Sequence, residues 1–222
     1  MDGVLSALDV LNGGKTIWSL QTDGKPLLDG SLKDAEMWLD GSKHRLIPSL
    51  DGNFYLQSEN FVRPIAVTAE SLLRSSLKFG QNSVAGGKEL TTYSIELDSG
   101  KINFACSIAG CDKSSKVTEN SDNLIVRRTT QTVRAVDTIT GEERWNVTVG
   151  EHELSMASVY DRLDADLVAE FKFQIRHSLG EVTAFDMLRG GHWTVQLQSP
   201  IAESWQVANN ELTPVSIFDP EA

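Results

Sequence analysis

The sequence predicts a mainly β protein whose antiparallel sheets are built from hairpin repeats, with one short inserted helix. Three observations support this fold class: apolar and small residues alternate with a period of two, a short turn motif recurs along the chain, and an aromatic residue follows each turn. Alternation with a period of two is typical of a strand that packs one face. The stretch RAVDTITGEERWNVTVG (134–150) contains all three features.

An acidic residue marks the turn of each repeat. Four stretches align on it: LSALDVLNGGKTIW (5–18), TYSIELDSGKINF (92–104), VRAVDTITGEERW (133–145) and VTAFDMLRGGHW (182–193). A weaker fifth copy is DGNFYLQSE (51–59). The anchors are Asp9, Ser58, Glu96, Asp137 and Asp186, at spacings of 49, 38, 41 and 49 residues. Because this period lies in the range of propeller blades, we expect about five quinoprotein-like or propeller-like hairpin repeats.

The residues around each anchor have consistent roles. Two positions before it lies a small side chain: Ala7, Ser94, Ala135 or Ala184. An acidic anchor can accept hydrogen bonds from the backbone ahead of it, and the glycine that follows allows a positive φ. The aromatic residue then opens the returning strand and buries a large area: Trp18, Phe104, Trp145 or Trp193.

One segment departs from this rhythm. VTAESLLRSSLKFG (67–80) begins with Thr68 as a helix N-cap, continues with a leucine stripe and ends on Gly80, which predicts a helix over about 68–79. The polar stretches at about 112–123 and 158–167 predict loops.

Composition limits the function classes. The 222 residues, 40% of them hydrophobic, are enough for a single domain spanning 1–222. A net charge of −11 disfavours nucleic-acid binding, because an acidic surface repels phosphates. The chain has no apolar run long enough for a membrane span, and its first residues do not resemble a signal peptide.

Catalytic and cofactor motifs are not predicted. The Gly-Lys sequences at 13–16 and 86–88 lack the first glycine of a phosphate-binding loop. The four histidines, His44, His152, His177 and His192, do not have the spacing of zinc ligands. A quinone-cofactor dehydrogenase needs more than about five repeat units, and this chain also lacks an adjacent pair of cysteines. We therefore expect no catalytic residue, no metal and no cofactor.

Two features depend on the cellular compartment. Cys106 and Cys111 are separated by four residues, so a disulfide in an oxidising compartment and two free cysteines both stay open as interpretations. Asn146-Val147-Thr148 fits the N-glycosylation sequon, and strand alternation points Asn146 away from the face that Trp145 buries.

Four local signatures together resemble the lumenal sensor domain of the PERK family, the PKR-like endoplasmic-reticulum kinases that phosphorylate translation initiation factor 2-alpha. They are VTAESLLRSSLKFG (67–80), GGKELTTYSIELDSGKINFACSIAGC (86–111), RRTTQTVRAVDTITGEERWNVTVGEHEL (127–154) and SPIAESW with VSIFDP (199–220). A more distant similarity is to the lumenal domain of the inositol-requiring kinase–endoribonuclease. The family often has a long acidic insertion after the segment matching GEHEL, and here about ten residues (158–167) replace it.

The resemblance implies a stress sensor in the endoplasmic reticulum lumen, which is the non-enzymatic part of a single-pass membrane kinase. Unfolded polypeptides and the lumenal chaperone BiP would regulate it. The domain would self-associate as a dimer or tetramer, activate the cytosolic kinase and so attenuate translation. The chain itself carries neither an HRD nor a DFG kinase motif.

Family dimers are expected to pair edge strands. The matching segments lie around 101–105 and 127–134, and the second is rich in Thr and Val with a polar alternate face, as suits an edge strand. An ordinary interior strand is the alternative interpretation. The predicted interface residues are Lys101, Asn103, Ala105, Arg127, Thr130, Thr132 and Arg134.

Two other classes of protein remain as alternatives. A β-propeller-like scaffold for protein assembly, with no signalling role, would be monomeric and would form a closed ring of more than five blades. A cofactor enzyme would carry a chromophore and a metal.

Overall fold

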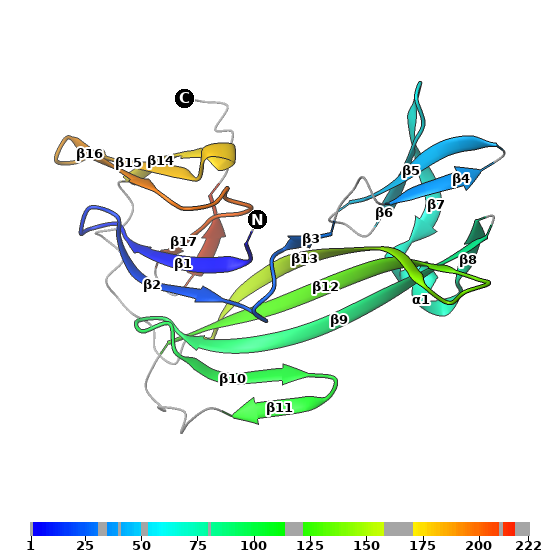
Figure 1. The fold of residues 1–222 in the computed structure, drawn as a ribbon. Helices are drawn as coiled ribbons and strands as arrows, with labels where there is room; N and C mark the ends of the chain where they lie inside the picture. Colours follow the sequence, from blue (N-terminus) through cyan, green and yellow to red (C-terminus); the bar gives the residue numbers. More distant parts are fainter. Residues whose placement is uncertain are drawn as a thin grey trace. The chain divides into compact units, whose positions relative to one another are not determined.

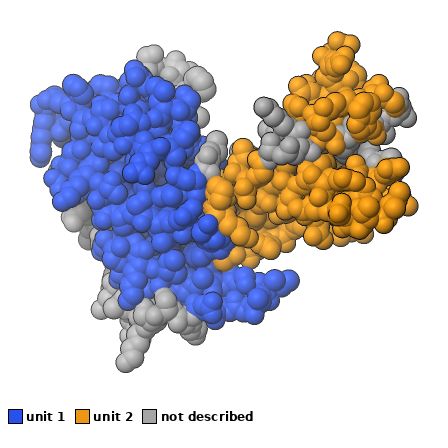
Figure 2. Space-filling view, viewed as in Figure 1, with its two compact units in different colours: residues 1–24, 92–127, 154–222 blue, residues 25–91, 128–153 orange. Residues whose placement is uncertain are grey.

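The structure, a computed structural model, describes residues 2–30, 35–39, 41–49, 53–79, 81–113, 122–157, 171–208 and 211–215. Its backbone is mainly β, and the described part contains one short α-helix and one 3-10 helix (Figure 1). The chain forms two compact units, coloured separately in Figure 2. Unit 1 comprises residues 1–24, 92–127 and 154–222, and unit 2 comprises residues 25–91 and 128–153.

The described strands form five sheets, and every strand pair whose register is described is antiparallel. The largest sheet has the order β11 (Gly110–Lys113), β10 (Ile102–Ser107), β9 (Asn82–Glu96), β12 (Asn123–Asp137), β13 (Glu143–Ala157) and β3 (Leu28–Asp29), with β8 (Leu77–Phe79) also paired to β9. A four-stranded sheet contains β4 (Glu36–Leu39), β5 (Ser42–Pro48), β6 (Asn53–Gln57) and β7 (Val62–Thr68).

Three smaller sheets belong to unit 1. They are the hairpin of β1 (Val4–Asp9) and β2 (Lys15–Gln21), the sheet of β14 (Phe171–Arg176), β15 (Glu181–Asp186) and β16 (Gly191–Gln196), and the hairpin of β17 (Trp205–Ala208) and β18 (Glu211–Pro214). The 3-10 helix η1 (His177–Leu179) connects β14 to β15.

The mainly antiparallel β architecture is confirmed, but the propeller-like arrangement of the repeats is not. Two predicted repeats, those anchored on Glu96 and Asp137, do not form separate blades, because β9 and β10 lie in the same sheet as β12 and β13. These long strands also cannot be equivalent to propeller strands, since β9, β12 and β13 each have 15 residues. The repeat is therefore a local hairpin used in several different sheets.

The chemistry of the predicted turns is confirmed in detail. Each aspartate anchor accepts hydrogen bonds from two backbone N–H groups ahead of it with one carboxylate oxygen, Oδ1. The donors are Leu11 and Asn12 at Asp9, Ile139 and Thr140 at Asp137, and Leu188 and Arg189 at Asp186. A glycine with φ between 67° and 74° then donates its N–H to the anchor carbonyl, at Gly14, Gly100, Gly141 and Gly190. Only a residue that tolerates this positive φ closes the turn without strain.

The small residue before each anchor faces the aromatic residue across the hairpin. Ala7 is the cross-strand partner of Trp18, Ser94 of Phe104, and Ala184 of Trp193. Directly opposed residues in an antiparallel pair place their side chains on one face, so a small residue leaves room for the ring. This pairing explains why the two positions recur together in the sequence.

Two tryptophans link the hairpins of unit 1 to one another. The Trp193 indole N–H donates to the Val10 carbonyl at 3.0 Å, and its ring lies over Gly14, where an added Cβ would be 2.5 Å from the ring. The Trp18 indole N–H donates to the Leu97 carbonyl at 2.7 Å, and its ring lies over Gly100 at 2.6 Å from such a Cβ. In both cases the accepting carbonyl belongs to the residue after the anchor, and the covered glycine closes the turn.

Each unit has its own hydrophobic core. The core of unit 1 contains the buried residues Leu5, Tyr93, Ile95, Leu124 and Val126. The core of unit 2 is formed by Ala35, Leu46, Phe54, Leu56, Ala69, Leu72, Val84, Val133, Ala135, Trp145 and Val147. Alternate residues of β5 and β6 supply Leu46, Phe54 and Leu56, as expected for strands with one packed face.

The inserted helix begins as predicted but is shorter. Thr68 caps helix α1 (Ala69–Arg74), since its hydroxyl accepts the Ser71 N–H at 3.0 Å. The prediction of a helix to residue 79 is wrong, because Leu77 pairs with Val84 in β8 and its side chain packs on the core of unit 2. Gly80, the predicted end, and residues 158–167 lie outside the described residues, as do residues 114–121 of the predicted loop 112–123.

Candidate functional site

The predicted interface residues near β10 do not form one exposed surface. Lys101 is exposed, but Asn103 is only 2% exposed and its side-chain amide donates to the side-chain oxygen Oδ1 of Asn123 at 2.7 Å. Ala105 is partly buried against the core of unit 1. Of these three, only Lys101 presents a side chain that another chain can contact freely.

The residues predicted on β12 also divide between surface and interior. Arg127 and Arg134 are exposed. Thr130 is 5% exposed and accepts a hydrogen bond from the Arg128 Nε at 3.3 Å. Thr132 is partly buried, with its hydroxyl 3.1 Å from that of Thr148 on β13.

The prediction that segment 127–134 is an edge strand is wrong, because β12 lies between β9 and β13 and both of its edges are paired within the chain. Segment 101–105 leads into β10, which likewise lies between two strands. The polar residues of β12 have internal partners instead: the Thr132 hydroxyl pairs across the sheet, and Arg128 is fully buried. Sequence composition could not separate a polar interior strand from an edge strand.

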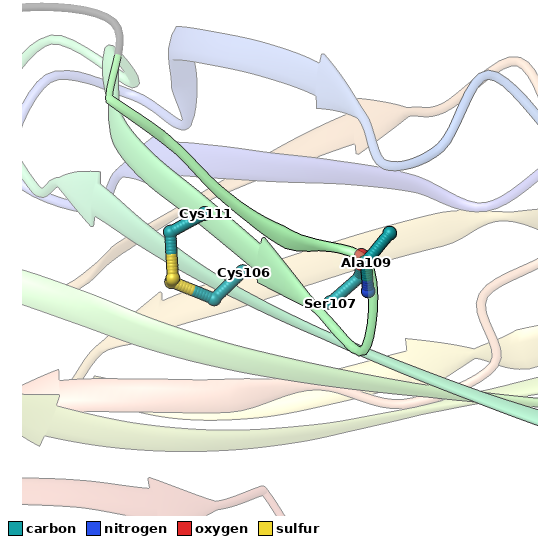
Figure 3. The surroundings of a disulfide bond; sticks show 4 residues. All are labelled: Cys106, Ser107, Ala109 and Cys111. Carbon is teal, nitrogen blue, oxygen red and sulfur yellow. A yellow bond between two sulfur atoms is a disulfide. The ribbon is translucent and has the colours of Figure 1, made fainter.

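Among the strands described, β11 ends the large sheet, and it carries a disulfide. Cys106 and Cys111 are direct cross-strand partners, with sulfur atoms 2.09 Å apart and Cα atoms 4.0 Å apart (Figure 3). The bond closes a hairpin whose two-residue loop places Ile108 fully in solvent. Of the two interpretations left open by the sequence, the structure contains the oxidised pair.

The sequon asparagine lies on β13 with its side chain exposed. The neighbouring Trp145 is 5% exposed and faces the core of unit 2, so the strand alternates there as predicted. Gly30 lies against the backbone of Asn146, where an added Cβ would be 2.3 Å from the Asn146 carbonyl oxygen. The asparagine side chain is therefore accessible for modification.

A buried arginine, which the sequence analysis did not single out, fixes the segment before β3. Arg128 is 0% exposed, and its guanidinium donates to the Lys25 carbonyl at 3.0 Å and the Pro26 carbonyl at 2.9 Å. Close packing continues at Gly150, whose N–H donates to the Leu27 carbonyl. No local sequence pattern indicates this pairing, since its partners lie more than 100 residues away.

The Asp137 turn contains an ion pair. An Arg144 guanidinium nitrogen lies 2.5 Å from Asp137 Oδ2, while Oδ1 accepts the Thr140 and Ile139 N–H groups. The hydrogen bond from Arg144, together with those from the two backbone groups, lowers the pKa of Asp137 to about 2. Asp137 is thus held ionised as part of the turn.

The potential metal ligands of the described residues are not gathered in one place. The four histidines lie on separate elements (β5, β13, η1 and β16), and no cluster of three metal-ligating side chains occurs among the residues described. None of the described helices is long and apolar enough to cross a membrane. The described surface has sheet edges, exposed apolar side chains and an exposed sequon asparagine.

Comparison with known proteins identifies relatives along nearly the whole chain. The chain is 34% identical over 223 residues to the eukaryotic translation initiation factor 2-alpha kinase pek-1 of Caenorhabditis elegans. It is 35% identical over 248 residues to the eukaryotic translation initiation factor 2-alpha kinase 3 of Rattus norvegicus. It is 34% identical over 251 residues to the same kinase of Bos taurus. Each match covers 99% of this chain. The chain spans only 20% to 22% of the length of these kinases. No family model matches.

A solved structure shares the fold. The compact lumenal domain of yeast Ire1 aligns with 98% of this chain and 73% of its own, with a TM-score of 0.57 and 18% sequence identity. At this identity the similarity concerns the fold alone.

Proposed function

The chain belongs to the PERK family of eukaryotic translation initiation factor 2-alpha kinases, matching about a fifth of the length of these relatives, and from this premise we propose that it is the lumenal stress-sensing domain of a transmembrane kinase. The observation that carries the proposal is the 34–35% identity over 99% of the chain. The fold it shares with the lumenal domain of Ire1 supports the same assignment.

In the proposed mechanism the domain senses and the rest of the kinase acts. Accumulation of unfolded polypeptide, or release of the chaperone BiP, causes the domain to self-associate in the endoplasmic reticulum lumen. Self-association brings the cytosolic kinase domains together, and the active kinase attenuates translation. The chain contributes no catalytic group to this reaction, in keeping with the absence of HRD and DFG motifs from its sequence.

The chemistry of the surface suits the lumen. An oxidising compartment preserves the Cys106–Cys111 disulfide on the outer hairpin of the large sheet, and a secretory compartment contains the machinery that glycosylates Asn146. We therefore assign an N-linked glycan to Asn146 within the proposed function.

The exposed members of the predicted interface are all basic: Lys101, Arg127 and Arg134. The chain carries a net charge of −11, so two copies repel each other over most of their surface. Basic residues that meet the acidic surface of a second copy replace this repulsion by attraction, which supports their place in a self-association surface. We retain these three residues in the proposal and remove Asn103 and Thr130, because their side chains are buried.

Sedimentation velocity over a hundredfold range of concentration, with and without a reduced and alkylated unfolded protein, tests the proposal. We expect the 24.4 kDa chain to shift toward twice its mass or beyond, and to do so at lower concentration when unfolded protein is added. An Arg127→Glu, Arg134→Glu variant is expected to need more protein to associate.

Arg74→Glu is the matched control, because Arg74 is also exposed but lies on α1, outside the predicted interface. A chain that stays monomeric at every concentration, with and without unfolded protein, contradicts the proposed function. Equal weakening by the Arg74 control leaves self-association in place but removes the assignment of its surface.

A further inference from the structure

Unit 1 contains two turns that receive a tryptophan and one turn of the same design that does not. At the Asp9 and Glu96 turns, an indole donates to the carbonyl after the anchor and its ring covers the glycine that closes the turn. The Asp186 turn has the same construction, with the Gly190 N–H donating to the Asp186 carbonyl. Within the described chain, no indole reaches the carbonyl after Asp186.

Exposure separates the two kinds of turn. Val10 and Leu97, which follow the two occupied anchors, are partly buried, and Gly14 is buried beneath Trp193. Met187, which follows Asp186, is 58% exposed, and an added Cβ on Gly190 would have no atom within 4 Å. The Asp186 turn therefore presents an acceptor and a glycine with space above it.

The open turn also has an apolar rim. Phe185, Met187 and Leu188 flank the anchor Asp186 and are 37%, 58% and 66% exposed. Covering these three apolar side chains with a partner would lower the free energy. The Asp137 turn is also uncovered, but its exposed apolar residue is Ile139 alone, and its Thr138 N–H and hydroxyl both donate to the Gln81 carbonyl.

A matching occupant is present on the same chain. Trp38 on β4 is 65% exposed, whereas the other four tryptophans are partly or fully buried. It lies on the first strand of its four-stranded sheet, opposite Lys43, with its side chain in solvent. An indole left in solvent has both the ring and the N–H donor that the occupied turns bind.

We propose that the Asp186–Gly190 turn is a docking site for an indole, and that its occupant is Trp38 of a second copy of this chain. The Trp38 N–H donates to the Met187 carbonyl and its ring covers Gly190, in the way that Trp193 and Trp18 bind their own turns. The proposal rests on the self-association in the proposed function and names one contact through which it occurs. A contact between two different surfaces of identical chains is heterologous, so it joins copies head to tail.

Two variants remove one half of the contact each. Trp38→Ala deletes the indole and leaves the turn intact. Gly190→Ala leaves the indole and places a methyl group where the ring would lie, which in the occupied Gly14 turn would be 2.5 Å from the ring. Gly141→Ala is the matched control, because Gly141 closes the same kind of turn with a similar positive φ and open space above it.

The decisive experiment measures association between the variants. Fluorescently labelled Gly190→Ala chain is titrated with unlabelled Trp38→Ala chain and, separately, with unlabelled Gly190→Ala chain. Only the first titration pairs an intact indole with an intact turn, so we expect half-saturation at a concentration at least about tenfold lower than in the second. A Trp38→Ala, Gly141→Ala titrant is expected to match Trp38→Ala, and circular dichroism establishes that each variant is folded.

Any association through another surface is common to both titrations, so their difference reports this contact alone. Superimposed curves overturn the docking proposal, even when the chain still self-associates and the proposed function stands. The docking proposal is also overturned if the Trp38→Ala, Gly141→Ala titrant binds as weakly as the Gly190→Ala titrant. In that case the weaker binding comes from strain in any glycine turn. Failure of the unsubstituted chain to associate at all removes the proposed function as well.

Discussion

The hydroxyl oxygens of Thr132 and Thr148 lie 3.1 Å apart, joining the central strand β12 to its neighbour β13. Thr148 is also the third residue of the sequon that begins at Asn146. One hydroxyl thus has a role in the folded sheet, as part of a cross-strand hydrogen bond, and a second role in the proposed glycosylation, as part of the sequon.

These two roles can be separated by substitution. Asn146→Gln is expected to remove the glycan and, in unglycosylated protein, to change the free energy of unfolding by less than about 0.5 kcal/mol, because the side chain is exposed. Thr148→Val is expected to remove the glycan and also to destabilise the unglycosylated protein by about 1 kcal/mol through loss of the hydrogen bond. Secretory expression with glycosidase digestion reports the glycan, and urea unfolding of bacterial protein reports stability.

Thr148→Ser is the control, since it keeps both the sequon and a hydroxyl. Thr132→Val tests the same hydrogen bond from its other side and does not affect the sequon. A glycan that persists in Asn146→Gln would place the modification elsewhere on the chain.

The Asp137–Arg144 pair predicts a pH dependence of stability. The pKa of Asp137 is lowered from 3.8 to about 2 in the folded protein, so the unfolded chain binds its proton first as the pH falls. The stabilisation from this carboxylate is complete well above pH 3.8 and is lost as the pH falls from about 4 to about 2. Asp137→Asn lacks this titration, so we expect the stability difference between the two proteins to be constant above about pH 5 and to shrink below pH 4.

Urea unfolding at several pH values between 2 and 6 measures this difference. Asp186→Asn is a useful comparison, because Asp186 accepts the same pair of backbone N–H groups but no arginine bond to it is found in the described chain. A difference for Asp137→Asn that does not change between pH 6 and pH 2 would show that the carboxylate is not held ionised by its partners.

Because Arg128 is buried, we expect even a substitution that keeps its size to lower the free energy of unfolding. Arg128→Met keeps much of the side-chain volume but leaves the Lys25 and Pro26 carbonyls without their donor. We expect a loss of about 1–3 kcal/mol in the free energy of unfolding, since these part-buried acceptors lose a charged donor. Arg127→Met, at the adjacent exposed position, is expected to change it by less than about 0.5 kcal/mol.

Thermal and urea unfolding compare the two variants. Similar stabilities for Arg128→Met and Arg127→Met would mean that the carbonyls find other partners and that the arginine does not fix this segment.

The adjacent glycines Gly13 and Gly14 provide a test of the tryptophan contact. Both have a positive φ, of 68° and 74°, so alanine strains the backbone at either position by about 1 kcal/mol. Only at Gly14 does the new Cβ meet a ring, since Trp193 would lie 2.5 Å away, whereas Gly13 has no atom within 4 Å. We expect Gly14→Ala to be less stable than Gly13→Ala by a further 1–3 kcal/mol or so, as found for overpacked sites.

Tryptophan fluorescence complements the unfolding curves, because displacement of Trp193 exposes its indole to water. Equal stability and equal emission of the two alanine variants would contradict the close packing of Trp193 on this turn.

The parts of the fold that depend on neighbouring residues were predictable from sequence. The Asp9, Asp137 and Asp186 turns follow from side-chain hydrogen bonds within three residues, and the Thr68 cap follows from the same kind of local chemistry. The helix length was not predictable, because Leu77 gains more from pairing in β8 and packing on the core than from continuing α1.

The candidate site depends on contacts between residues far apart in the sequence, so less of it could be predicted. A Thr-rich strand with alternating polar residues is typical of a sheet edge, yet β12 is a central strand. Its polar side chains have partners inside the chain, because Thr132 hydrogen-bonds Thr148 and Arg128 donates to the carbonyls of residues 25 and 26. The repeat tryptophans were identified, but the turns that receive their indoles were not. Those turns are recognisable only once the hairpins are placed in space, since the Trp193 acceptor is 183 residues away.

The Trp193 contact has a consequence for the order in which the chain can fold. The ribosome makes its acceptor, Val10, 183 residues before it makes Trp193. Ser199 and Asp2 are joined across a similar span by a hydrogen bond of 2.6 Å. During synthesis the hairpin of β1 and β2 therefore emerges with its Gly14 turn uncovered, and it stays so until Trp193 has been translated. Such late closure slows folding and leaves apolar surface open to chaperones, so a nascent copy of this domain is itself, for a time, an unfolded polypeptide.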